Sequence, residues 1–296
     1  MAPVTRRLPP KHKPIPLEVL TERTRTFKGA VRFLQEHNIL HKSRQCKKGH
    51  QMALAFRPST ARWRCSRQGC RVEISVLTDT FLSGCKLPLK NVIKYIYHWS
   101  MGDRQEKAAW YSGIGASHSA AVWRKKLRAL CTIHNKTLLP LPEGGTVEVD
   151  EIDLDGNIVL GVQWRLTNHV YLQCISQKTQ KTIYPILKRV IAPGAEIHTD
   201  GLAVYKALDK QRGYNWTHLV VNHCRNFKDP VTGACTNRTE AFNRILRDNY
   251  SKNSELDGIE GYLEEQMFRR NSNPEPVFNT ILQAIADITD ITFKNI

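Results

Sequence analysis

Three acidic residues in the second half of the chain occur where a protein could hold divalent cations. Asp150 ends an alternating apolar run that begins at Thr146, Asp200 ends a shorter run before Gly201, and Glu240 opens an amphipathic helical pattern. Such carboxylates can converge on one point, but they stay ionised together only if cations neutralise them. Two Mg²⁺ (or Mn²⁺) ions about 3.5–4 Å apart would clamp the attacking and leaving oxygens of a phosphoryl displacement. The pattern therefore predicts an enzyme that cuts phosphodiesters through Asp150, Asp200 and Glu240.

Each of these acids also has an ordinary structural explanation. Asp150 could be a turn carboxylate, and Asp200 with Gly201 could be a simple Asp-Gly turn. Glu240 could be a solvated residue in the first turn of a helix, where the helix dipole favours negative charge. We expect Glu151, beside Asp150, to support the metal ligands and not to bind metal itself.

Four motifs in the same order resemble those of the ISXO2-like transposases, which include bacterial insertion-sequence enzymes and the eukaryotic Merlin elements. They are Val147–Glu151, His198–Gly201, Thr236–Glu240 and Tyr262–Asn271, and the similarity extends over roughly residues 40–275. The resemblance implies an α/β, RNase H-like catalytic domain, with a mixed sheet flanked by helices. It also implies an Asp, Asp and Glu (or Asn) triad, which makes Asn237 a rival to Glu240.

The resemblance implies a DNA transposase that binds element ends, cleaves DNA with metal ions and performs strand transfer. Its partners would be double-stranded DNA, as terminal repeats and target, and a second copy in a homodimer. His198 and Arg247 are candidates for contact with DNA phosphates. Two alternatives stay open: a domesticated DNA-binding protein that no longer moves, and a nuclease of the same fold without strand transfer.

The net charge of +17 is unevenly distributed along the 296 residues. Residues 1–149 carry 27 of the 44 lysines and arginines but 9 of the 27 acids. This asymmetry indicates a polyanion-binding half joined to a near-neutral half, although a solvated charged surface would also explain it. No run of eighteen apolar residues and no secretory signal are present, so we expect no membrane partner and no disulfide framework.

Four potential soft ligands lie close together in the basic half. Cys46 and His50 flank one tight turn and Cys65 and Cys70 flank another, with fourteen residues between the two motifs. This spacing predicts a zinc-ribbon-like module with a structural Zn²⁺. The family usually has Cys-x-x-Cys twice, so His50 is the least secure of the four ligands. Two incidental cysteine pairs are the alternative.

A helix-turn-helix is expected in residues 85–139. Its second helix, from His118 to Leu130, is rich in lysine and arginine and follows a glycine-containing turn and the expected capping residue Ser117. A basic second helix suits insertion in the major groove of DNA, whereas an ordinary helical pair with a solvated face is the alternative. The residues expected near DNA are His118, Ser119, Arg124, Lys125 and Arg128.

The expected domain order begins with a disordered basic arm (1–24), then a helix with the zinc-ribbon-like module (25–84) and the helix-turn-helix (85–139). An RNase H-like transposase domain with a C-terminal helix follows (140–296), after a Pro- and Gly-containing linker. In that domain we expect three strands at hairpin spacing, then helices and strands in alternation. The expected strands are Val147–Ile152, Ile158–Trp164, Val170–Ser176, Glu196–Thr199 and His218–Asn222, and the expected helices are Lys181–Val190 and Leu202–Gln211. Basic clusters in the arm favour the nucleus in a eukaryotic host; in a bacterium the location would be the cytoplasm or nucleoid.

Overall fold

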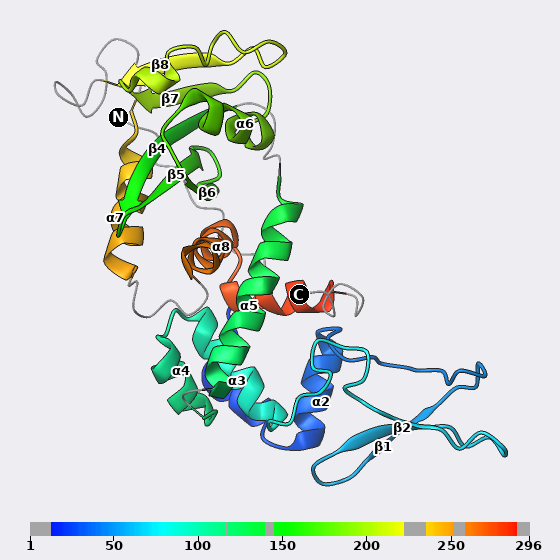
Figure 1. Ribbon diagram of the computed structural model, residues 1–296. Helices are drawn as coiled ribbons and strands as arrows, with labels where there is room; N and C mark the ends of the chain where they lie inside the picture. Colours follow the sequence, from blue (N-terminus) through cyan, green and yellow to red (C-terminus); the bar gives the residue numbers. More distant parts are fainter. Residues whose placement is uncertain (1–12, 116–117, 140–144, 222–234, 251–257, 289–296) are drawn as a thin grey trace. The chain divides into compact units, whose positions relative to one another are not determined.

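The computed structural model describes residues 13–115, 118–139, 145–221, 235–250 and 258–288 (Figure 1). The described residues divide into two compact units, one within Leu127–Asn271 and a second within Leu8–Lys126 and Ser272–Ile296. The division at Leu127 differs from the boundary expected at residue 140. The first twelve residues of the expected arm and residues 140–144 of the expected linker lie outside the described ranges.

A five-stranded mixed sheet forms the centre of the unit Leu127–Asn271. Its strand order is β6-β5-β4-β7-β8, in which β5 and β6 are antiparallel neighbours and β7 and β8 continue parallel to β4. The first strand of the unit is therefore central, as in an RNase H-like sheet, and the predicted fold class is confirmed. The strands are β4 (Thr146–Leu154), β5 (Asn157–Trp164), β6 (Val170–Ile175), β7 (Glu196–Asp200) and β8 (Thr217–Val221).

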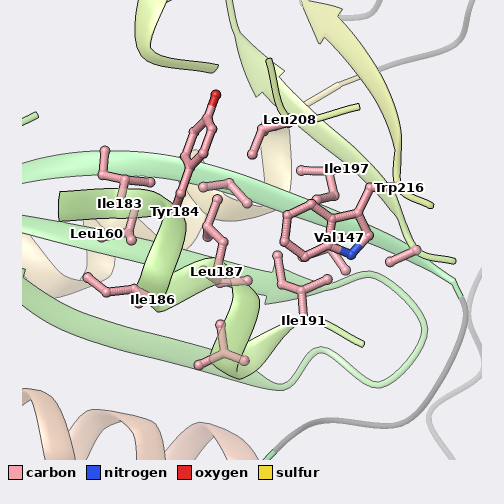
Figure 2. Packing of buried hydrophobic residues seen from close by; sticks show 14 of the residues in the cluster. Val147, Leu160, Ile183, Tyr184, Ile186, Leu187, Ile191, Ile197, Leu208 and Trp216 are labelled. Atoms are coloured by element: carbon pink, nitrogen blue, oxygen red, sulfur yellow. The ribbon is translucent and has the colours of Figure 1, made fainter. Parts of the chain in front are cut away.

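One face of this sheet is covered by α6 (Gln180–Val190). Side chains alternate between the two faces of a strand, and Val147 and Val149 of β4 point to the α6 face. They are fully buried in a cluster with Ile183 and Leu187 of α6 (Figure 2). This apolar packing fixes the central strand within the core.

The opposite face of β4 carries Glu148 and Asp150, followed by the buried Ile152 and Leu154. The two apolar residues pack in a cluster with residues of α7 (Asn237–Asn249) and α8 (Gly258–Asn271). Figure 1 shows α7 beside β4. The amphipathic helix that carries Glu240 is thus attached to the same side of the sheet as Asp150.

The prediction of a helix at Leu202–Gln211 is wrong. Only a 3₁₀ turn, Ala203–Tyr205, and further turns occur there. The hydroxyl of Tyr184 donates to the carbonyl oxygen of Val204 (2.9 Å) and accepts from the amide of Ala207 (3.3 Å). Tertiary contacts therefore engage backbone groups that a continuous helix would pair internally.

The second unit contains helices and a small three-stranded antiparallel sheet. Its sheet consists of β1 (Ala53–Phe56), β2 (Ala61–Arg64) and β3 (Glu73–Ser75), in that order. Its helices are α1 (Leu17–Arg23), α2 (Phe27–Glu36), α3 (Leu89–Ser100), α4 (Gln105–Ser112), the first part of α5 (His118–Thr137) and α9 (Val277–Ala286).

Two elements of the second unit differ from the expectations. Helix α1 lies where a disordered arm was expected, and it forms because Leu20 is fully buried. Helix α9 was expected to end the catalytic domain, but Phe278 packs edge-on against Tyr97 of α3, with ring centroids 5.1 Å apart. None of the helices in the described ranges is long and apolar enough to cross a membrane.

Candidate active site and metal centres

Asp150 and Asp200 occupy corresponding positions on adjacent parallel strands. The register of β4 and β7 pairs Val147 with Ile197 and Glu148 with His198. Continuing this register by two residues brings Asp150 opposite Asp200, on the same face of the sheet. Both carboxylates are partly exposed. The topology thus brings together two acids that are far apart in the sequence, at an accessible edge of the core.

Local hydrogen bonds orient both carboxylates. Oδ1 of Asp150 accepts the amide of Glu151 at 2.9 Å, and Oδ2 accepts Nδ2 of Asn243 at 3.0 Å. Oδ1 of Asp200 accepts the amide of Leu202 at 3.1 Å, which closes the turn after β7. These bonds restrict Asp150 in the middle of β4 and Asp200 at the end of β7.

Helix α7 contacts Asp150 through Asn243. Glu240 is partly exposed and accepts a hydrogen bond from the hydroxyl of Thr236 at 2.9 Å, while its rival Asn237 is exposed. Asn243 lies one turn beyond Glu240 and is 5% exposed. Asn243 was not among the predicted site residues. Its position could have been noticed in the sequence, because it is an amide beside Phe242 on the apolar side of an amphipathic helix.

The chemistry of the acidic site fits a hard divalent cation. Mg²⁺ takes one or two protein carboxylates and keeps several waters, as two partly exposed aspartates on neighbouring strands would allow. Within the described ranges, the potential metal ligands whose ligand atoms all lie within 4.8 Å of one another are Cys46, His50, Cys65 and Cys70. The carboxylate oxygens of Asp150, Asp200 and Glu240 are therefore not all within 4.8 Å of one another. Ionised carboxylates repel, so a closer approach requires a cation. Metal binding by these residues stays a prediction.

Glu151 points to the other face of β4, toward Tyr205 and Lys178. It accepts a hydrogen bond from the Tyr205 hydroxyl, and the Lys178 ammonium lies 3.3 Å from its Oε2. Burial raises the pKa of the Glu151 carboxyl to about 7, with Lys178 opposing this and the charges of Asp200 and Asp150 adding to it. Glu151 therefore lies on the face of β4 opposite to Asp150, and the supporting role expected for it stays a prediction.

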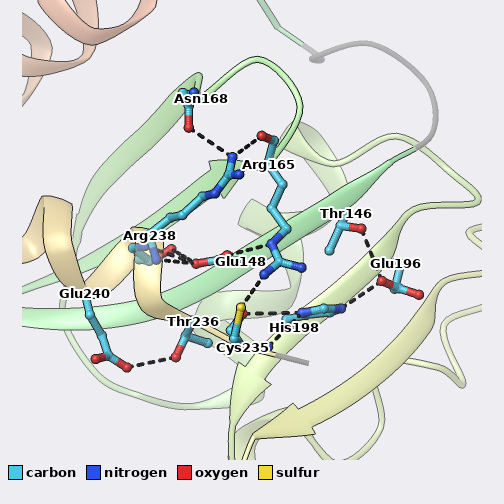
Figure 3. Close-up of polar contacts among 11 residues, drawn as sticks. Thr146, Glu148, Arg165, Asn168, Glu196, His198, Cys235, Thr236, Arg238 and Glu240 are labelled. Carbon is cyan, nitrogen blue, oxygen red and sulfur yellow. Dashed lines mark hydrogen bonds and ion pairs between the residues drawn. The ribbon is translucent and has the colours of Figure 1, made fainter. Parts of the chain in front are cut away.

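His198 is placed in the interior, where its ring nitrogens have protein partners. Its side chain is 2% exposed, with Nε2 2.8 Å from Oε1 of Glu196 and Nδ1 accepting the Cys235 amide at 3.2 Å (Figure 3). The prediction that His198 contacts DNA phosphates requires an exposed ring, and in this structure His198 instead links β7 to the residue before α7.

The four predicted zinc ligands gather at one point of the second unit. The sulfur atoms of Cys46, Cys65 and Cys70 and a ring nitrogen of His50 all lie within 4.8 Å of one another. The amide of Gly49 donates to the Cys46 carbonyl at 2.8 Å, and Gly49 and Gly69 both have φ near +77°, the left-handed conformation that glycine adopts freely. Three sulfurs and one imidazole fit a closed tetrahedral zinc site.

The predicted DNA-contacting residues of α5 fall into two groups. His118 and Lys125 are exposed and Ser119 and Arg124 are partly exposed, so all four are accessible. Arg128 is 3% exposed, and its Nε donates to Oε2 of Glu265 at 3.0 Å. Arg128 is therefore part of a buried ion pair, which corrects the expectation of a DNA contact.

Two further predictions concern Arg247 and the turn before α5. Arg247 is exposed on α7, where a phosphate could reach it. The turn between α4 and α5 begins at Gly113, which has φ +72°, but its residues 116 and 117, with the expected cap Ser117, lie outside the described residues.

Comparison with known proteins gives a family for the sheet-containing unit. Residues 145–271 match the family described as the ISXO2-like transposase domain. None of the curated proteins matches the chain. Among solved structures, the chain is similar to the catalytic core domain of BIV integrase, with 15% sequence identity over 47% of this chain and 93% of that chain, and a TM-score of 0.35. The matched residues include Asp150, Asp200 and Glu240, so this part of the chain is similar to the ISXO2-like transposase domain.

Proposed function

We propose that this protein is a DNA transposase that binds the ends of its element, cleaves DNA in the presence of Mg²⁺ (or Mn²⁺) and joins the freed end to target DNA. The observation that carries the proposal is the alignment of Asp150 and Asp200 on parallel strands within the matched domain. Helix α7 supplies the third polar group from the same face of the sheet, through Glu240 or a neighbouring amide.

In this proposal Asp150 and Asp200 would hold the divalent ions, which would supply neutralisation of the developing charge and activation of the attacking oxygen. Asp150 and Asp200 fix the position of the reacting phosphate relative to the sheet, since each is held by a hydrogen bond to its own chain. No side chain needs to form a covalent bond with DNA. The accessible basic residues of α5 and the exposed Arg247 bind phosphates of double-stranded DNA.

The second unit contributes DNA binding and a structural metal centre. Cys46, His50, Cys65 and Cys70 hold Zn²⁺, and the helices α4 and α5 act as the helix-turn-helix. The excess of basic residues before residue 150 supplies the charge for a polyanion. The protein acts on two DNA ends as a homodimer, in the nucleus if the host is eukaryotic, as a Merlin-type enzyme would.

Asp150→Asn and Asp200→Asn test the proposal on the full chain. Each variant should still retard DNA on a gel but should lose nicking of a DNA carrying the element end. Asp155→Asn is a matched control, because Asp155 is an exposed turn residue with φ +54°, a conformation that asparagine tolerates. Normal nicking by either active-site variant would contradict the assignment.

A strand-transfer assay separates the transposase from a nuclease of the same fold. An oligonucleotide with a free 3′-hydroxyl at the element end should become joined to a target plasmid in the presence of Mg²⁺. Nicking without joined product would support the nuclease alternative. DNA binding without either reaction would support the domesticated binding protein.

A further inference from the structure

Glu148 is a charged residue in the interior of the domain. It lies on β4 two residues before Asp150, between Val147 and Val149, and is 0% exposed. Removing a carboxylate from water is strongly unfavourable unless other groups compensate for it. An arrangement that keeps Glu148 buried must therefore give both of its oxygens good partners.

The partners of Glu148 come from another strand end and from α7. Oε1 accepts Nε of Arg165 at 2.8 Å. Oε2 accepts the backbone amides of Arg238 at 3.0 Å and Thr239 at 3.1 Å, and the hydroxyl of Thr239 at 3.4 Å (Figure 3). Both oxygens are used, one by a cation and the other by the first turn of the helix.

Helix α7 depends on this distant residue for its N-terminal cap. The first amides of a helix have no partner within the helix and are normally capped by a side chain at its start. Thr236, at the cap position of α7, makes no such bond. Glu148 caps α7 from the central strand instead, and its negative charge lies at the positive end of the helix dipole.

Hydrogen bonds at two points hold α7 at a fixed position along β4. Glu148 binds the amides of Arg238 and Thr239, and Asp150 binds the side chain of Asn243. Two residues of a strand span about 6.8 Å, and four to five residues of a helix span about 6–7.5 Å. The spacings match, so α7 runs alongside β4 with Glu240 between the two anchoring points.

Further bonds at the start of α7 hold the same end. Arg238 contacts the carbonyl oxygen of Arg165 and Oδ1 of Asn168, and Arg165 also contacts the sulfur of Cys235. His198 of β7 holds the amide of Cys235. The beginning of the helix is therefore attached to β4, to the turn after β5 and to β7.

We propose that Glu148 is a positioning residue that caps α7 and sets the third polar ligand against Asp150 and Asp200. The proposal rests on the proposed function for its catalytic consequence, but the cap itself does not depend on it. Replacing one oxygen of Glu148 by an amide would leave a helix amide or Arg165 without its acceptor. The start of α7 would then loosen, and the metal site would lose its third side.

The test compares Glu148→Gln with wild type in two measurements on the full chain. Hydrogen exchange of the peptide containing residues 236–243 should become about tenfold faster. The Mg²⁺ concentration for half-maximal nicking should rise by about tenfold, as for other residues that support metal ligands. Asp153→Asn is the matched control on β4, because Asp153 is exposed and its Oδ1 accepts the amide of Gly156 in the adjacent turn; it should change neither value.

Glu148→Asp provides a second variant if Glu148→Gln fails to fold, since it keeps the charge and shortens its reach by one methylene. It should give smaller changes in the same direction. Unchanged exchange in these variants would overturn the cap. Faster exchange with an unchanged Mg²⁺ requirement would overturn the positioning role and leave Glu148 merely structural. If wild type does not nick DNA at all, the proposed function fails, whereas the exchange measurement still decides the cap.

Discussion

Asn243 on α7 and Asp150 on β4 are joined by a hydrogen bond of 3.0 Å between Nδ2 and Oδ2. The bond connects α7 to the central strand at Asp150, one of the two aspartates that the proposed mechanism requires. Oδ1 of the same buried amide has no hydrogen-bond partner among the residues that the structure describes. Asn243 thus orients Asp150 on one side and keeps an unused acceptor on the other.

Asn243→Ala should reduce nicking by about 10- to 100-fold, the usual effect of removing a hydrogen-bond partner of a metal ligand. Without the amide, Asp150 can rotate away from the direction of Asp200. Nicking rates across a range of Mg²⁺ concentrations provide the measurement. Asn249→Ala is the matched control, because Asn249 is an exposed asparagine at the end of the same helix. Equal rates for the two variants would refute a role for Asn243.

Removal of the metal from the second unit should unfold the module around Trp63. Cys46, Met52, Trp63 and Cys65 form a small buried cluster that has little apolar area without the metal. Purified wild type should contain one zinc per chain by elemental analysis, and Cys65→Ser should lose it. Cys85→Ser is the control, since Cys85 lies outside the four-ligand group. Full zinc content in Cys65→Ser would show that the metal binds elsewhere.

Lys125 and Arg128 should respond differently to substitution although they are close in the sequence. Lys125→Ala removes an exposed charge, so DNA affinity should fall and the slope of log affinity against log salt should decrease by up to about 0.9. Arg128→Met breaks the buried pair with Glu265 and should destabilise the protein by about 3 kcal/mol or more. Salt-dependent binding and urea unfolding measure the two effects. A stable Arg128→Met protein with weakened DNA binding would restore the original sequence-based prediction.

Asp103 should stabilise the second unit in a pH-dependent way. Burial alone would raise the pKa of Asp103, but hydrogen bonds from His98 (2.8 Å) and Lys107 (2.9 Å) outweigh it, so the pKa lies below its usual value. A lowered carboxyl pKa gives stability that is present above the usual pKa, about 3.9, and is lost as the pH falls through the lowered value.

Asp103→Asn should therefore be less stable than wild type at pH 6 by about 1 kcal/mol, a small effect because the site is partly exposed. The difference should shrink by pH 3. Urea unfolding at the two pH values measures it, and comparison with wild type removes the contribution of other carboxyl groups. A gap that is constant or larger at pH 3 would contradict the sign.

Much of the sheet could be predicted from the sequence, because apolar alternation marks each strand. The expected strands at Val147, Ile158, Val170, Glu196 and His218 all occur, within two residues at their ends. The spatial order of the strands depends on pairing between distant segments, which the pattern along each strand does not show. The pattern could not reveal the turn at Leu202, because a tyrosine hydroxyl from α6 decides it.

The candidate site was less predictable because its supporting residues break the pattern. Glu148, Asn243 and His198 are polar residues at buried positions. In an apolar–polar pattern, a polar residue is assigned to the solvent side of its element. This assignment predicted a phosphate contact for His198 and gave no role to Glu148. The predicted DNA contact of Arg128 failed for the same reason. In a helix rich in lysine and arginine, the sequence does not distinguish an arginine that pairs with a buried Glu265 from its exposed neighbours.

The central claim is that Asp150 and Asp200 hold the same divalent ion, and metal-soaked crystals test it most directly. Anomalous scattering from Mn²⁺ should give a peak between the two carboxylates, at about 2.1 Å from an oxygen of each, as for the Mg²⁺ that it replaces. The peak should be absent from Asp200→Asn crystals. A peak that contacts neither aspartate, or one that persists in that variant, would contradict the account.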